Sequence, residues 1–298
     1  MRVFTAILCC CLFGLAASAA AAETQPVVSA AERWAEDGSG GTPDFFRHVV
    51  PLFSKLRCNN RACHGSFQGQ GGFRLSMFGY DFAMDHQNLL KRVNLKSPGK
   101  SLVLNKPTSE DEHGGGLRLK AGSWEQKVLH RWITNGAKSV PSKPARFVRL
   151  DVSPREIVVQ KPHDTVQLQA VAVWSDGTRE DVTCLTRFQS KDDSIAKVST
   201  AGLVRSMGKG DSHIISFYDN GIVPTPVMLP VSHLSGDRYP KVPTPTRIDE
   251  LVVAKLRKLG IRPSELCTDE EFLRRVGLDI AGTLPTPAEI RSFLKDTS

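Results

Sequence analysis

The spacing of apolar residues between positions 42 and 140 is that of amphipathic helices. The clearest stripe lies in the segment "SWEQKVLHRWITNGA" and consists of Trp124, Val128, Leu129, Trp132 and Ile133. Residues three or four positions apart share one face of a helix, so this stripe predicts a helix over 123–135 that packs into a core. Ser123 is placed to cap its start and Gly136 to end it. Glycine-rich segments separate the helical stretches, so we expect a small helical domain over 42–140.

After Phe147 the helical spacing ends, and apolar residues recur at every second position. Segments such as "DTVQLQAVAVWSDG" and "HIISFYD" alternate apolar and polar residues, and turn signals such as Asp176-Gly177 and Ala201-Gly202 separate the segments. A series of short strands at this spacing is typical of a β-sandwich. We therefore predict an all-β domain over 146–233.

Helical spacing returns after a proline-rich linker at 234–246. Amphipathic segments follow between 247 and 298, and Thr268 with Glu271 has the pattern of a capping box. A segment of this length is small for an independent hydrophobic core, so we expect it to be the opening part of a truncated helical domain. The predicted fold class is a multi-domain chain with a small helical domain, an all-β domain and a short C-terminal helical segment.

The first 22 residues have the pattern of a secretory signal peptide. Arg2 precedes an apolar run from Val3 to Ala17, and small residues follow, which predicts cleavage near Ala22. A membrane anchor is the alternative, but the run is shorter than the about 20 residues that a helical span needs. We expect an exported protein, periplasmic or extracellular, without a transmembrane segment in the mature chain. Residues 23–41 end in Gly and Ser and are expected to form a flexible leader.

The charge of the chain narrows the choice of partners only slightly. The net charge is +8, and removal of Arg2 with the signal peptide leaves +7 (8 − 1). Lys and Arg are scattered, so the sequence does not predict nucleic-acid binding, whereas a mildly basic surface favours an acidic partner or an anionic envelope. The sequence also lacks a recognisable nucleophile–base pair, phosphate-binding loop or pair of catalytic carboxylates. The sequence therefore does not favour an enzyme.

The segment "CNNRACHG" carries the candidate chemistry. Four cysteines remain beyond the signal peptide, and two of them, Cys58 and Cys63, lie close together with His64 directly after the second. Covalent haem attachment needs two thiols for the vinyl groups and an imidazole for the iron, usually spaced as C-x-x-C-H. The spacing here is C-x4-C-H, which retains the second half of that motif. We interpret these residues as a haem c attachment site.

Three other uses of these residues remain open. A Cys58–Cys63 disulfide is feasible in an oxidising compartment, but it leaves His64 without a role. Structural zinc usually needs four ligands in two close pairs, and a second pair is missing. A catalytic thiol would need a base and an oxyanion site, and the adjacent His64 is poorly placed to act as the base.

An electron-carrying haem iron needs a second axial ligand. The candidates in the chain are Met77, Met84, His86, His113 and His130. His113 stands out because it lies in the polar loop "TSEDEHGGGLRL", where Gly114 to Gly116 allow the backbone to approach a flat ligand. An exposed loop histidine is the structural alternative, and Met77 is the alternative ligand.

Four segments resemble, in order, the cytochrome-c-like domain of large secreted planctomycete proteins. They are "CNNRACHGSFQGQGGFRLSMFGYD", "RVNLKSPGKSLVLNKPT", "HGGG" and "VLHRWITNGA", and together they cover about residues 57–137. In commoner members of that family a Met-Pro-Pro sequence stands at the position of His113, and its Met is the distal ligand. The resemblance therefore implies that His113 is the distal ligand here, with an imidazole on each side of the iron.

The remaining parts of the chain also resemble known modules. Residues 146–233 resemble a bacterial immunoglobulin-like domain of group 2, with the segments "LDVSP" and "AVWSDGTREDVT" as its signposts. Such domains act as spacers and adhesion modules. Residues 247–298 resemble the opening of a helical domain of unknown function that follows in the same planctomycete proteins.

These observations predict a monohaem c-type cytochrome module that transfers electrons outside the cytoplasm. Cys58 and Cys63 would hold one covalent haem c through thioethers, with His64 as the proximal and His113 as the distal ligand. The other expected pocket residues are Gly71, Gly72, Phe73 and Trp132. One alternative is a secreted adhesion or binding protein that has a Cys58–Cys63 disulfide, lacks haem and contacts a glycan or the envelope. Another is the electron-feeding part of an enzyme whose catalytic domain is absent. The redox partner is not identified by the sequence.

Overall fold

The computed structural model describes residues 27–36, 40–139 and 145–296, so the predicted signal peptide lies outside the described residues. The chain divides into two compact units, which are taken one at a time below. The first comprises the described residues up to Val152, with Gln169–Arg187 and Phe217–Val223, and the second comprises Ser153–Leu168, Phe188–Ser216 and the described residues from Pro224. Helices and antiparallel sheets both occur, as expected for a multi-domain α+β protein.

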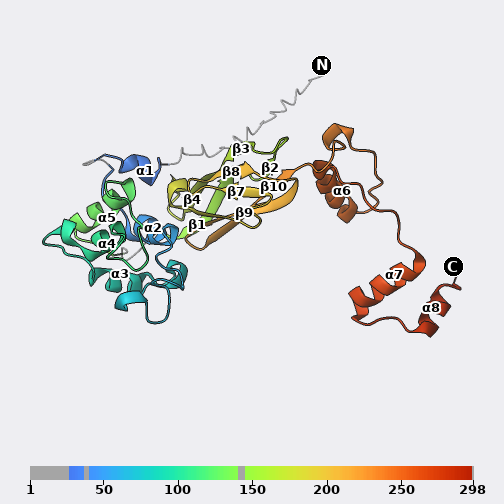
Figure 1. Ribbon diagram of the computed structural model, residues 1–298, viewed down its shortest axis with the longest axis horizontal. Helices are drawn as coiled ribbons and strands as arrows, with labels where there is room; N and C mark the ends of the chain where they lie inside the picture. Colours follow the sequence, from blue (N-terminus) through green and yellow to red (C-terminus); the bar gives the residue numbers. More distant parts are fainter. Residues whose placement is uncertain (1–26, 37–39, 140–144, 297–298) are drawn as a thin grey trace, which may run out of the picture. The chain divides into compact units, whose positions relative to one another are not determined.

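Short helices and turns build most of the first unit (Figure 1). In chain order they are α1 (Ala30–Arg33), η1 (Phe45–Val49), α2 (Val50–Lys55), η2 (Gln70–Gly72), η3 (Met77–Gly79), α3 (Phe82–Leu90), η4 (Pro98–Lys100), α4 (Leu102–Asn105), η5 (Lys106–Thr108) and α5 (Trp124–Thr134). The predicted stripe of α5 is confirmed, because Val128, Leu129, Trp132 and Ile133 are buried. The Ser123 hydroxyl accepts a hydrogen bond from the Gln126 N–H and caps this helix.

The leader region is more ordered than its composition predicts. Residues 27–36 contain α1, in which Ala30 is buried, and the Trp34 side chain directly after it is also buried. Val27 forms a bridge with Glu180 of the sheet. The flexible leader predicted over 23–41 is thus replaced, within its described residues, by a segment that packs on the core. An indole that large gains roughly 2–3 kcal/mol from burial, which offsets the cost of ordering the chain around it.

A buried carboxylate fixes the turn between η3 and α3. The Asp85 side chain accepts hydrogen bonds from the Ser76 N–H at 2.5 Å and from the Ser76 hydroxyl at 2.6 Å. Asp85 is only 2% exposed, and desolvation raises the pKa of its carboxyl despite these hydrogen bonds. Because the raised pKa belongs to the folded state, ionisation of Asp85 weakens folding as the pH rises.

This linkage predicts that the free energy of unfolding differs between the wild type and Asp85→Asn by an amount that depends on pH. In the variant, the amide oxygen can accept from the Ser76 N–H and the amide nitrogen can donate to the Ser76 hydroxyl. The wild type should therefore lose stability relative to the variant as the pH rises from about 4, the ordinary carboxyl pKa, toward 7. Urea unfolding of both chains at several pH values measures the difference. A difference in unfolding free energy that stays constant across that range would contradict a raised pKa of Asp85 in the folded state.

Within the described ranges, ten strands form three sheets. They are β1 (Phe147–Ser153), β2 (Ile157–Val158), β3 (Thr165–Gln167), β4 (Gln169–Trp174), β5 (Arg179–Asp181), β6 (Arg187–Ser190), β7 (Ala196–Val198), β8 (Leu203–Ser206), β9 (Gly210–Tyr218) and β10 (Gly221–Leu229), with the turn η6 (Thr183–Leu185) between β5 and β6. The sheet orders are β1-β4-β5, β2-β10-β9-β6 and β3-β8-β7. Burial alternates along β9, which is the period-two pattern of a half-buried strand. The described residues therefore confirm a β-rich region after the helical part.

The β4–β5 hairpin has the Asp-Gly turn and the alternating strands that the sequence predicts. Its turn contains Asp176 and Gly177, and Gly177 has a φ of +82°, a conformation that favours glycine. Val173 pairs with Arg179 and Val171 with Asp181 in the antiparallel register. This register places Glu180 on the opposite side of β5 from its two neighbours, where its side chain is buried.

The second unit ends in helices with well-formed caps. After the turn η7 (Gly236–Arg238) come α6 (Arg247–Leu259), α7 (Asp269–Val276), the π-helix η8 (Gly277–Ala281) and α8 (Pro287–Phe293). Thr246 with Asp249 and Thr286 with Glu289 form capping boxes, whereas Thr268 caps α7 through its hydroxyl alone. Among the described residues, no helix has the length and hydropathy required to cross a membrane.

Candidate functional site

A cavity of about 590 Å³ within the first unit gathers the residues on which the sequence prediction depends. Its lining includes both thiols and both imidazoles of the predicted set, namely Cys58, Cys63, His64 and His113. Gly71 and Phe73 also line it, and both were expected near the ligand. The predicted site residues from two separate loops therefore meet at one hollow.

The loop between the cysteines is compact despite its extra residues. The His64 N–H donates to the Cys58 carbonyl at 2.9 Å and closes the loop, while the N–H groups of Cys63 and Gly65 both donate to the Asn60 carbonyl at 2.9 Å. A Cβ at position 65 would lie 2.0 Å from the Asn59 carbonyl oxygen, so only glycine fits there. The C-x4-C-H-G spacing thus folds into a closed turn that presents its thiols and imidazole to the same cavity.

His64 is oriented by backbone carbonyls. Its Nδ1 donates to the Phe73 carbonyl at 2.9 Å and lies 3.2 Å from the Gln70 carbonyl. A carbonyl can only accept, so the proton of the neutral ring is on Nδ1 and Nε2 keeps its lone pair. Desolvation lowers the pKa of His64, and the neighbouring His113 and Arg92 lower it further. The hydrogen bonds to the Phe73 and Gln70 carbonyls raise it, but the net shift is downward. His64 is therefore a neutral imidazole with a free ligand atom at neutral pH.

His113 is held in the same way on its own loop. Its Nδ1 donates to the Gly116 carbonyl at 2.8 Å, which again leaves Nε2 free. A Cβ on Gly115 would lie 3.0 Å from the His113 ring, so the small residue makes room for the imidazole. The ring centroids of His64 and His113 lie 6.2 Å apart with an interplanar angle of 25°.

This separation suits two imidazoles that share one metal ion. A ring nitrogen lies about 2 Å from a bound first-row transition metal, so two axial imidazoles place their centroids roughly 6 Å apart. Within the described part of the chain, no three His, Cys, Asp or Glu side chains converge as ligands of a bare metal ion. Two axial imidazoles are the ligand set of an iron whose other positions are filled by a macrocycle.

The cysteines of the cavity are free thiols. Burial and, to a smaller extent, the nearby Cys63 raise the pKa of Cys58 to about 12, whereas Arg118 opposes the shift. The thiolate is the form that attacks disulfides and oxidants, so Cys58 is a slow partner in disulfide exchange at neutral pH.

The charges around the cavity were missed by the sequence analysis because they lie far apart in the chain. Four cationic residues line it, and they are Arg57, Arg92, Lys106 and Arg118. The single carboxylate of the lining belongs to Glu112, which lies 3.9 Å from the Lys106 ammonium. The cavity therefore has an excess of positive charge.

Three of the predicted pocket residues lie elsewhere. Gly72 and Trp132 are not part of the cavity lining, and neither is Met77, whose side chain is 39% exposed. The Trp132 indole stacks on Phe45 at 5.5 Å and donates its N–H to the Lys138 carbonyl at 2.9 Å. Trp132 is thus a core residue of the helical part, and of the five candidate distal ligands only His113 lines the cavity.

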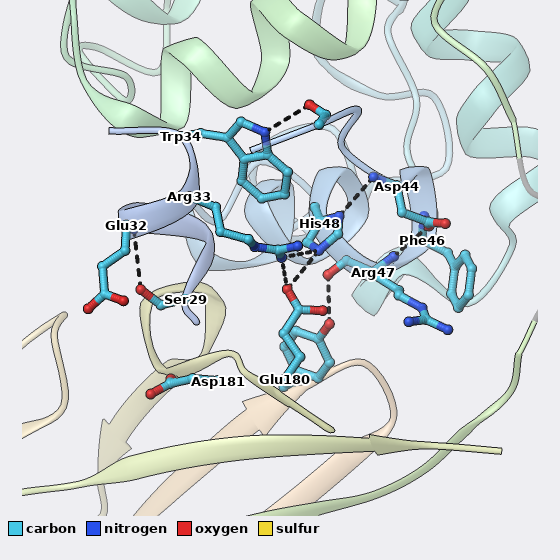
Figure 2. Close-up of polar contacts among 12 residues, drawn as sticks. Ser29, Glu32, Arg33, Trp34, Asp44, Phe46, Arg47, His48, Glu180 and Asp181 are labelled. Carbon is cyan, nitrogen blue, oxygen red and sulfur yellow. Dashed lines mark hydrogen bonds and ion pairs between the residues drawn. The ribbon is translucent and has the colours of Figure 1, made fainter. Parts of the chain in front are cut away.

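A second polar cluster, formed by Arg33, His48 and Glu180, lies in the same unit but does not line the cavity (Figure 2). The Asp44 N–H donates to His48 Nδ1 at 2.8 Å. His48 Nε2 therefore carries the proton and donates to Glu180 Oε1 at 2.9 Å. Arg33 forms an ion pair with the same oxygen.

This cluster ties three elements to one buried carboxylate. Glu180 is 2% exposed and lies on β5, whereas Arg33 ends α1 and His48 lies in η1. Trp34 packs edge-on against the His48 ring at 4.9 Å, as Figure 2 shows. The buried charge is thus paired and hydrogen-bonded, as burial of a carboxylate requires.

The fold and site define a multi-domain α+β chain with one cavity that combines two thiols and two metal-competent imidazoles. Residues 247–298 match the family model described as "PSCyt2: Protein of unknown function (DUF1549)". This agrees with the helical domain of unknown function that these residues resemble in the sequence analysis. No curated protein matches the chain.

Proposed function

We propose that the first unit is a c-type cytochrome module that binds one haem covalently and transfers electrons. The observation that carries the proposal is the pair of imidazoles, His64 and His113, with centroids 6.2 Å apart in a cavity that Cys58 and Cys63 also line. The cavity volume of about 590 Å³ falls in the range of cofactor sites, roughly 300–1,000 Å³. The residues present therefore fit a haem.

Each residue of the site has a defined task in this proposal. Cys58 and Cys63 would hold the haem through thioethers, and His64 and His113 would hold its iron. When bound, the haem supplies one-electron chemistry. Since these two imidazoles would supply both remaining iron ligands, oxygen and peroxide would find no open site, which favours electron transfer over oxygen chemistry. The hydrogen bonds from Nδ1 to the Phe73 and Gly116 carbonyls keep both rings oriented.

The proposal extends to the rest of the chain. Residues 1–22 would direct export, so that haem attachment and electron transfer take place in the periplasm or outside the cell. The β-rich region over 146–233 would be an immunoglobulin-like module of group 2 that contacts a glycan or an envelope partner. Together with the planctomycete cytochrome-c-like domain that residues 57–137 resemble, these assignments describe an exported redox protein.

A haem-stained denaturing gel of the exported chain tests the proposal. The chain is produced in cells that have haem-attachment machinery, and covalent haem is expected to migrate with the polypeptide. Absence of stain, combined with a Cys58–Cys63 disulfide found by mass spectrometry, would overturn the proposal and favour the secreted binding protein instead.

Replacement of His113 by methionine is expected to change the iron ligation without loss of haem. A thioether ligand favours ferrous iron more than an imidazole does, so the midpoint potential should rise by on the order of 0.1 V or more within the range of about 0.8 V that axial ligands span. Optical redox titration measures this shift. His130→Met on the exposed side of α5 is the control and should leave the potential unchanged. Equal potentials in the wild type and His113→Met would exclude His113 as a ligand.

A further inference from the structure

Among the described residues, no carboxylate pairs with the three arginines of the cavity, and loop carbonyls hold two of them, Arg92 and Arg118. Arg92 Nη2 donates to the Gly71 carbonyl at 3.0 Å, and its guanidinium carbon lies 5.8 Å from the centre of the Phe73 ring. Arg118 Nε donates to the Gly115 carbonyl at 2.9 Å. These contacts fix each guanidinium in place but leave most of its N–H donors available.

The two anchoring carbonyls belong to the two loops that orient the imidazoles. Gly71 lies between Gln70 and Phe73, whose carbonyls hold His64. Gly115 lies beside Gly116, whose carbonyl holds His113. One arginine is therefore attached to the loop on the His64 side of the cavity and the other to the loop on the His113 side.

A ligand that satisfies this arrangement carries anionic groups as well as a metal. Lys106 is close to the Glu112 carboxylate, so the positive charge that has no counter-ion in the described part of the chain is that of Arg57, Arg92 and Arg118. Guanidinium groups bind carboxylates through two parallel hydrogen bonds, which gives both affinity and orientation. Arg92 and Arg118 are also within reach of solvent, where a carboxylate keeps part of its hydration.

We propose that Arg92 and Arg118 bind the two propionate carboxylates of the haem and thereby set its orientation between His64 and His113. This inference rests on the proposed function and adds the residues that recognise the anionic edge of the cofactor. The arginines are positioning residues, because they hold the porphyrin rather than the iron.

The test compares haem with its dimethyl ester, in which both propionates are neutral. The full chain carrying Cys58→Ala and Cys63→Ala is used, so that binding is non-covalent and its equilibrium can be measured by absorbance titration. The chain is expected to bind haem at least about tenfold more tightly than the ester, since one charge-assisted pair contributes about a factor of ten. Adding Arg92→Met and Arg118→Met should remove this preference, whereas Lys96→Met, an exposed charge outside the cavity, should retain it.

The comparison separates the two proposals. If both porphyrins give a low-spin spectrum of two-imidazole coordination with equal affinity, the haem proposal stands and the role of the arginines is overturned. Retention of the preference for haem in the double-arginine variant would also overturn it. If neither porphyrin gives that spectrum in a chain whose circular dichroism matches the wild type, both proposals fail. Comparing both chains with both porphyrins separates the contribution of the arginine–propionate pairs from a general loss of affinity in the variant.

Discussion

Covalent haem is expected to disappear completely from the polypeptide when Cys58 and Cys63 are both replaced by alanine. A thioether survives a denaturing gel, whereas coordination by His64 and His113 does not, so haem staining reports the cysteines alone. Each single variant should retain one thioether and stain more weakly. One vinyl group then stays conjugated with the porphyrin, so the reduced spectrum of each single variant should shift to longer wavelength.

The chain offers a matched control for this experiment. Cys184 is also a half-buried free thiol, and desolvation raises its pKa to about 11, yet it does not line the cavity. Cys184→Ala should therefore stain as strongly as the wild type. Covalent haem in the double variant, or its loss in Cys184→Ala, would show that Cys58 and Cys63 are not the attachment residues.

The high pKa of Cys58 bears on the competition between haem attachment and disulfide formation. At neutral pH nearly all of this residue is the thiol, which is the form that adds across a vinyl group with its own hydrogen. Disulfide exchange requires the thiolate, whose fraction falls about tenfold for each unit by which the pKa exceeds the pH. Burial of Cys58 therefore slows disulfide exchange in which this residue is the attacking group.

Local patterns account for the parts of the fold that the sequence predicts well. Helix α5 follows from an apolar stripe and a capping serine, both of which act within a few residues. The β4–β5 hairpin follows from an Asp-Gly turn between alternating segments. In each case the stabilising contacts lie close together in sequence, where periodicity and turn chemistry can be read directly.

The same reasoning explains what could not be predicted. Arg33 and Glu180 are separated by 147 positions, and no periodicity links them, so the order of the leader segment escaped prediction. Within the site, Cys58, Cys63 and His64 are adjacent and were recognised together. Arg92 and Arg118 were not recognised, because scattered cations acquire a meaning only when the fold brings them to one cavity.

Trp132 illustrates the opposite error. The apolar stripe placed it in a core, and it was also expected near the haem, but a large buried ring needs no ligand beside it. Its stacking on Phe45 and its hydrogen bond to Lys138 account for its environment without a ligand. Size and apolar character therefore identified its burial correctly and left its role undetermined.

Replacement of Glu180 by glutamine is expected to destabilise the first unit strongly. Glu180 accepts from the His48 N–H and pairs with Arg33, and both its side chain and that of His48 are almost fully buried. A glutamine amide oxygen can still accept from both donors, but the neutral amide removes the negative charge that pairs with Arg33. Breaking a buried ion pair by removal of one member costs about 3–5 kcal/mol.

Thermal unfolding followed by circular dichroism measures this cost, and Glu156→Gln is the control. Glu156 pairs with Lys258 at 2.7 Å, but both side chains are more than a third exposed, so its loss should cost at most about 1 kcal/mol. A loss of 3–5 kcal/mol corresponds to a fall in Tm of roughly 6–20 °C for a unit of this size. Because Glu180 does not line the cavity, the folded variant should keep the haem spectrum of the wild type. Equal Tm values for Glu180→Gln and Glu156→Gln would mean that the buried cluster contributes no more than a surface pair, and that the burial of Trp34 and Ala30 alone holds α1 in place.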